Sequence, residues 1–181
     1  MEREIFLDQK TPKTENKKTR IEKILFYFRF WKKSFFAYGI FGAILFILNN
    51  IIASFFYAGG SHVDPTNPGY SFMWNYVSDL GRVHSLSGEL NLVSRIIFTI
   101  TLTLVGLSAV FFSAAFTDFF KKTKFSSIRY IALISGILYG LCYIIIGYLP
   151  LDTLYIFHTT IVIIAGTLRL IAISFFCSTY N

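Results

Sequence analysis

Long apolar runs separated by polar connections dominate the hydrophobic pattern of the chain. Four runs cover about residues 35–57, 96–119, 131–149 and 154–176, and each contains at most one charged side chain. An α-helix needs about 20 residues to cross about 30 Å of hydrocarbon, so each run is long enough to span a bilayer. The pattern predicts an all-α fold, a polytopic transmembrane bundle with four spanning helices.

The residues before the first apolar run have a different composition. Residues 1–33 are polar and strongly basic, and aromatic side chains are interleaved with Lys and Arg in residues 20–33. Such a segment is typical of a helix that lies in the membrane interface, and a cytoplasmic extension of the first spanning helix fits it equally well. We therefore expect a basic cytoplasmic tail over residues 1–33 and a transmembrane domain over residues 34–181.

The basic residues are clustered beside the apolar runs, and this clustering predicts the topology. Ten of the seventeen Lys and Arg residues precede Ser34, and four lie between Lys121 and Arg129. Loops rich in Lys and Arg stay on the cytoplasmic side, so both termini are predicted to be cytoplasmic. Residues 58–95 and the short turn at Pro150 would then face outward, with the chain in the cell membrane.

Composition narrows the class of protein further. Charged residues make up 15% of the chain, against roughly 25% in soluble domains. The net charge of +7 does not predict a nucleic-acid partner, because no soluble domain would display the basic residues. Cys142 and Cys177 form neither a disulfide framework nor a metal-binding spacing, and no nucleotide or haem fingerprint is present. We therefore expect no metal and no cofactor.

The long polar segment between the first two apolar runs divides into a loop and a short helix. Residues 61–69 are dense in turn-forming residues and predict an irregular loop, in which His62 and Asp64 are expected to be solvated. Residues 70–80 alternate aromatic and polar side chains, which predicts a short interfacial helix on the outer side. Gly81 is expected to end this helix.

Asp79 is the residue of this segment that most requires an explanation. It lies near the C-terminal end of the predicted short helix, where the helix dipole disfavours a negative charge. We therefore expect a partner for its carboxylate. An ion pair that pins the loop and a role in a functional site are the two alternatives. The candidate partners are Arg82, His84, Arg95 and His158.

Polar side chains within the apolar runs are costly and therefore informative. His158 lies about one turn into the fourth run, and an intramembrane histidine indicates a functional site unless it is a satisfied packing residue. Asn49 and Asn50 lie toward the outer end of the first run, so they should face the bundle interior or a wet cavity. A structural hydrogen bond between helices is the alternative for the two asparagines.

Three further features of the apolar runs have structural interpretations. Asp152 precedes the fourth run and is expected to cap its helix. Asp118 and Arg169 lie in the inner parts of the second and fourth runs and are predicted to form a structural ion pair. Gly136 and Gly140 form a Gly-x-x-x-Gly pattern, which permits the close approach of a neighbouring helix.

Two motifs of the outer segments together resemble a known family. They are Asn75-Tyr76-Val77-Ser78-Asp79-Leu80-Gly81 after a Pro-rich loop, and Leu149-Pro150-Leu151-Asp152 followed by His158. From about residue 35 to its C-terminus, the chain resembles the prokaryotic multi-pass membrane proteins catalogued as domain of unknown function 998. The resemblance implies that Ser78, Asp79 and His158 are recurring polar positions. Family members usually have six helices, which implies a shortened member that needs a partner, or a truncated reading frame.

The sequence predicts a function only in outline. The favoured hypothesis is non-enzymatic: a binder of a lipid or small ligand, a sensor or a subunit of a complex, with an outward-facing polar pocket. The alternatives are a membrane-embedded hydrolase of lipids or headgroups that uses Asp79 and His158, and a transporter or channel subunit. Expected partners are membrane lipids and either a second copy of the chain or an additional membrane subunit. The predicted pocket residues are Asn49, Asn50, Asn75, Ser78, Asp79, His84 and His158, and the catalytic candidates are Asp79, His158 and Ser78.

Overall fold

The structure is a computed structural model of the whole chain. It describes the backbone of residues 17–119 and 126–178 and the side chains of residues 21–23, 37–116 and 129–175. The chain divides into two units, Met1–Ser34 and Phe35–Asn181, and the contacts and sites described below belong to the second unit. The cytoplasmic tail and the interfacial helix expected in the first unit stay predictions.

Four long helices account for most of the described residues. They are α1 (Lys17–Phe55), α2 (Leu92–Phe119), α3 (Ser126–Tyr148) and α4 (Tyr155–Ser178). Each contains a span that is long and apolar enough to cross a membrane, namely Ala37–Phe55, Leu92–Phe116, Arg129–Tyr148 and Tyr155–Phe175. Large apolar side chains stay exposed on all four spans, where lipid chains would cover them. The prediction of an all-α bundle with four spanning helices is confirmed.

Paired glycines bring α2 and α3 into backbone contact. A Cβ atom built on Gly106 would lie 2.5 Å from the carbonyl oxygen of Gly140, and one built on Gly140 would lie 2.6 Å from the carbonyl oxygen of Gly106. Helices approach this closely only where neither residue carries a side chain. Gly136, one turn earlier on α3, lies against the Ser113 side chain. The packing role predicted for Gly136 and Gly140 is therefore confirmed.

Small residues also mediate the contacts of α1 and α4. On α1, Gly42 lies against Ser108 of α2, whose hydroxyl donates a hydrogen bond to the carbonyl oxygen of Tyr38. Only a narrow stripe of the described part of α4 is buried against the other helices. Its buried residues are two helical turns apart, so they lie on the same face of the helix. The buried members of this stripe are His158, Ala165 and Ala172.

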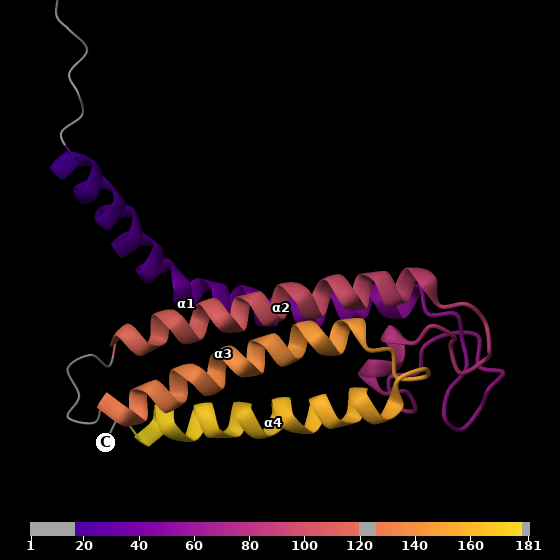
Figure 1. Cartoon of the computed structure of the whole chain (residues 1–181). Coiled ribbons are helices and arrows are strands. Elements are labelled where there is room, and N and C mark those ends of the chain that lie inside the picture. The colour runs from indigo at the N-terminus through magenta and orange to yellow at the C-terminus, as the bar shows by residue number, and fades with distance from the viewer. Residues whose placement is uncertain (1–16, 120–125, 179–181) are drawn as a thin grey trace, which may run out of the picture. The chain divides into compact units, whose positions relative to one another are not determined.

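The connection between α1 and α2 and the connection between α3 and α4 lie at the same end of the bundle (Figure 1). The link between them is direct, because Asp152 in the second connection accepts hydrogen bonds from the Val83 and His84 amides of the first. The prediction that these two polar segments share one end of the bundle is confirmed. We call it the loop end.

The predicted outer helix is shorter than expected. It consists of a single 3-10 helix, η1, over Val77–Gly81, and Gly81 ends it as predicted. The Asn75 side chain explains the late start, because its Oδ1 accepts a hydrogen bond from the Ser71 amide (3.0 Å) and its Nδ2 donates to the Gly60 carbonyl (3.1 Å). Hydrogen bonds of this kind replace those that a longer helix would need.

Replacing Gly140 with alanine tests the contact between α2 and α3. The new Cβ would overlap the Gly106 carbonyl, so we expect Gly140→Ala to lower the free energy of unfolding by about 1–3 kcal/mol. Thermal unfolding of the purified protein in detergent measures this. Gly166 of α4 is the matched control, because a Cβ there meets nothing within 4 Å and Gly166→Ala should leave stability unchanged or slightly higher. Equal losses in both variants would contradict the packing account.

Candidate functional site

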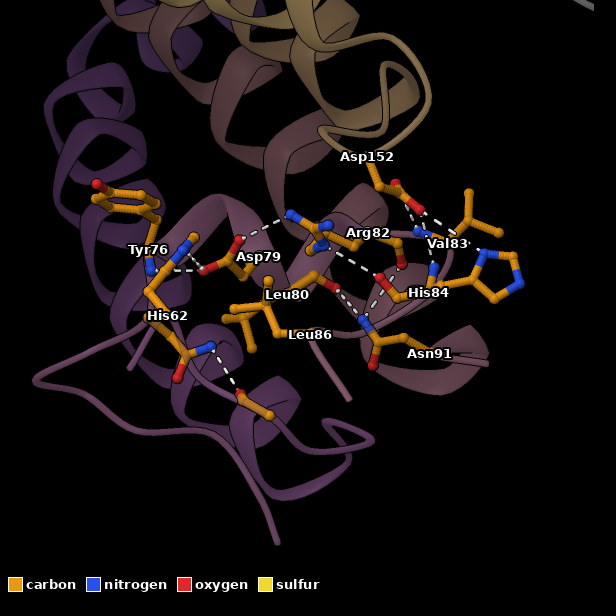
Figure 2. Close-up of polar contacts among 12 residues, drawn as sticks. His62, Tyr76, Asp79, Leu80, Arg82, Val83, His84, Leu86, Asn91 and Asp152 are labelled. Atoms are coloured by element: carbon orange, nitrogen blue, oxygen red, sulfur yellow. Dashed lines mark hydrogen bonds and ion pairs between the residues drawn. The ribbon is translucent and has the colours of Figure 1, made fainter. Parts of the chain in front are cut away.

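Asn91, just before α2, organises the backbone of the loop end. Its side chain is buried, and Nδ2 donates to the carbonyl oxygens of Leu80 (3.1 Å) and Arg82 (3.3 Å), as Figure 2 shows. Its Oδ1 accepts from the Ala58 amide (3.4 Å). The Ser94 hydroxyl, which is fully buried one turn into α2, also donates to the Leu80 carbonyl (3.2 Å). These bonds hold η1 against the beginning of α2.

Asp79 is fully buried, at 0% exposure, and both of its carboxylate oxygens face polar groups (Figure 2). Oδ2 accepts a hydrogen bond from the Tyr76 amide (2.7 Å) and lies 3.0 Å from Nε2 of His62. Oδ1 lies 3.5 Å from Nη1 of Arg82, and no described group donates a hydrogen bond to it. A buried carboxylate is tolerated only with such partners. The geometry therefore supports the prediction that Asp79 pins the loop.

The surroundings of Asp79 correct one expectation and reveal a partner that was not predicted. The residue lies in the first turn of η1, where its carboxylate bonds to the amide preceding the helix, so the local position favours its charge. His62 is exposed, as expected, but it also contacts the carboxylate, and its ring centroid lies 4.7 Å from that of Tyr76. Of the predicted partners, Arg82 is in contact with Asp79. No spacing along the chain could have indicated His62, because an irregular loop separates the two residues.

A second carboxylate, Asp152, joins the two connections of the loop end. It accepts hydrogen bonds from the Val83 and His84 amides, each at 3.0 Å, and lies 3.8 Å from the His84 ring nitrogen Nδ1. The expectation that Asp152 caps α4 is therefore wrong. Partial burial acts to raise the pKa of Asp152, but these two amides and the charge of Arg82 outweigh it and hold the pKa below its ordinary value.

Arg82 connects the two carboxylates. Its Nη1 faces Asp79, and its Nε donates a hydrogen bond to the His84 carbonyl (3.1 Å), so it reaches the segment that Asp152 holds. These contacts make the loop end a single polar network around Asp79.

The network also affects Tyr70. Burial is the main cause that raises the pKa of Tyr70 to about 12, and the negative charge of Asp79 is the next.

Next to this network lies a pocket of about 280 Å³ between the spanning helices. η1 contributes Val77 and Ser78, and every spanning helix contributes apolar or aromatic side chains. The histidine of α4 and an arginine of the same helix add polar groups. The lining residues are Phe46, Val77, Ser78, Phe98, Leu102, Tyr139, Tyr143, Ile146, His158, Val162, Ala165, Gly166 and Arg169.

His158 is the most deeply buried ionisable side chain of the pocket, at 3% exposure. Its Nδ1 lies within hydrogen-bonding distance of the Leu149 carbonyl oxygen, which fixes the orientation of the ring. Its Nε2 is buried and has no hydrogen-bond partner among the described residues. An unpaired buried polar atom costs free energy, so a group outside the described chain would stabilise it.

Four of the predicted pocket residues lie elsewhere. Asn50 is buried and its Nδ2 donates to the Phe46 carbonyl (2.6 Å), while its Oδ1 has no partner among the described groups. Asn49 is half-buried, Asn75 is bonded within the loop, and His84 is exposed. None of the four lines the pocket, whereas Ser78 and His158 do. Asp79 follows Ser78 directly but does not line the pocket either, because its carboxylate is engaged by the loop network, so five of the seven predicted residues lie outside it.

Sequence reasoning missed the aromatic part of the pocket. Tyr139 and Tyr143 lie one turn apart on α3, with ring centroids 4.8 Å apart, and both line the pocket. Their spacing places them on one helix face and could have indicated an aromatic wall. Tyrosines in apolar helices are also common near membrane interfaces, however, so the spacing alone does not distinguish the two. Arg169 lines the pocket as well. Its predicted ion pair with Asp118 stays a prediction, because the Asp118 side chain lies outside the described residues.

The spanning helices define the class of the protein, and a match to a family model identifies its family. Four membrane-competent helices make it a multi-pass membrane protein. The family described as "Protein of unknown function (DUF998)" matches residues 50–179, and the chain belongs to this family. The resemblance drawn from the two outer motifs is confirmed. No curated protein and no solved structure matches the chain significantly. No three His, Cys, Asp or Glu side chains gather into a possible metal site within the described part of the chain.

Replacing Asp79 with alanine tests the loop network. The variant leaves the Tyr76 amide and the Arg82 guanidinium without their buried partner, so we expect Asp79→Ala to lower the free energy of unfolding by about 3 kcal/mol. Unfolding in detergent, followed by circular dichroism, measures this. Asp64→Ala is the control, because Asp64 is exposed and its carboxylate bonds only to Thr66 nearby. Similar stabilities of the two variants would rule out an anchoring role for Asp79.

The lowered pKa of Asp152 predicts a pH dependence. A carboxyl whose pKa is depressed in the folded state stabilises that state at pH values above its ordinary pKa of 3.8. This contribution is lost as the pH falls through the folded-state pKa. We therefore expect Asp152→Ala to be less stable than the wild type at neutral pH, and the gap to narrow below pH 3.8. Thermal midpoints of both proteins across this range decide the matter. A gap that is independent of pH would contradict the assignment.

Proposed function

We propose that the protein binds an amphiphilic ligand, a membrane lipid or a small apolar molecule with a polar group, in the pocket beneath η1. The observation that carries this proposal concerns His158, which lines an otherwise largely apolar pocket and whose buried Nε2 has no partner among the described residues. Ligand sites in proteins have this composition, with mostly hydrophobic and aromatic walls and a few placed polar groups. Such binding is compatible with a sensor or with a subunit of a larger membrane complex.

The size of the pocket supports a ligand with a compact head and a longer apolar part. Its volume of about 280 Å³ lies just below the range of about 300–1,000 Å³ for small-molecule pockets. A second pocket of about 640 Å³ lies beside it, lined mainly by α1 and α2. The two share the lining residues Phe46, Tyr139, Tyr143 and Arg169. A head beside His158 and a chain in the second pocket fit this arrangement.

The loop end contributes Val77 and Ser78 to the wall of the pocket, and we propose that it faces away from the cytoplasm. The basic residues that precede Ser34 and those between Lys121 and Arg129 favour a cytoplasmic location for both termini. The pocket would then lie near the outer leaflet of the cell membrane. Asp79 is not proposed as a catalytic acid or base, since its carboxylate is held by His62, Arg82 and the Tyr76 amide.

Filling the pocket tests the proposed function. Gly166 lines the pocket and has open space around its Cβ position, so Gly166→Phe should occupy the site without disturbing the helix. Thr167→Phe places the same ring on the neighbouring exposed residue, which does not line the pocket. We expect native mass spectrometry to detect a tightly held lipid or small molecule on the wild type and on Thr167→Phe, and to find it largely lost from Gly166→Phe.

Two results would contradict the proposal. The first is a wild type that carries only rapidly exchanging lipids. The second is equal occupancy of a bound molecule in all three proteins, which would place the ligand elsewhere.

A further inference from the structure

The hydrogen bond of His158 to the Leu149 carbonyl determines which ring nitrogen carries the proton. A carbonyl oxygen can only accept, so Nδ1 must be the protonated nitrogen. In the neutral ring the other nitrogen, Nε2, is then an acceptor with a free lone pair. Among the described residues, the lining of the pocket contains the guanidinium of Arg169 and no carboxylate, so these residues offer no counter-charge for a positively charged imidazole.

We propose that the polar group of the ligand is an uncharged hydrogen-bond donor, a hydroxyl, that donates to Nε2 of His158. This inference rests on the proposed function and deepens it by naming the ligand chemistry. Ser78, from η1, lies in the same lining and can either donate to or accept from such a hydroxyl. The ligand class is a long-chain alcohol or a lipid with a free hydroxyl. A molecule that offers only ether or ester oxygens leaves Nε2 unpaired.

The remainder of the pocket suits the apolar chain of such a ligand. At a rise of about 1.5 Å per residue, His158 and Arg169 lie about 16 Å apart along α4, and both line the pocket. Between them the lining on α4 is Val162, Ala165 and Gly166, which leave room for a chain. The hydroxyl is therefore recognised at the loop end, with the chain directed toward the centre of the bundle.

Two probes with the same dodecyl chain, one with a hydroxyl donor and one with a methyl ether in its place, test this inference. Dodecanol carries a hydroxyl, and dodecyl methyl ether has the same chain with an oxygen that can only accept. We expect the alcohol to bind the purified wild type about tenfold more tightly than the ether, because the ether leaves a buried acceptor unpaired. Displacement of an environment-sensitive fluorescent fatty probe measures both affinities.

Variants locate the preference at His158. His158→Phe should bind the two probes equally, with the affinity for the ether unchanged, and His158→Gln should keep part of the preference because its amide oxygen remains an acceptor. Gly166→Phe should bind neither probe. Thermal unfolding confirms that each variant is folded, and equal affinities of the wild type for the two probes would overturn the proposal even without a variant.

The outcomes separate the two proposals. Equal affinities of the wild type for alcohol and ether, both abolished by Gly166→Phe, would overturn the donor assignment and leave the proposed pocket intact. A preference for the alcohol that persists in His158→Phe would also overturn it. Binding of neither probe to the wild type would count against the proposed function itself.

Discussion

The burial of one negative charge constrains the loop end of the bundle more than any other interaction. The Asp79 carboxylate is fully buried, so the chain must bring the Tyr76 amide, His62 and Arg82 to it from different directions. Breaking such an arrangement leaves a buried charge without compensation. Because Arg82 also bonds to the His84 carbonyl, the constraint extends to the segment held by Asp152. An irregular polar segment thereby acquires one defined conformation.

Hydropathy predicted the four spanning helices because the bilayer imposes a length and a composition on any helix that crosses it. The loop end was predictable only in part. The sequence indicated that Asp79 needs a partner and that the two polar connections share one end, but the pairing of Asp152 with the Val83 and His84 amides depends on irregular backbone. Contacts between distant positions of such backbone leave no periodic pattern in a sequence.

The candidate site shows the same division. Ser78 was singled out by the family resemblance, and His158 by its chemistry and position as well, and both line one pocket. Asn75 and His84 have equally polar side chains, but local hydrogen bonds hold the first in the loop and the second is exposed. The tyrosines of α3 were overlooked, since a tyrosine in an apolar helix looks the same whether it borders a pocket or the membrane interface. Burial, which the sequence does not state, separates these cases.

The adjacency of Ser78 and Asp79 has a thermodynamic consequence. One residue borders the pocket and the next anchors the loop, so the proposed binding of a ligand would be linked to the order of the loop. Such linkage is reciprocal: a molecule in the pocket raises the cost of opening the loop, and any event that loosens the loop weakens the molecule's affinity by the same factor. The conformation of the loop end, which lies beside the pocket, would thus report whether a molecule is bound between the helices.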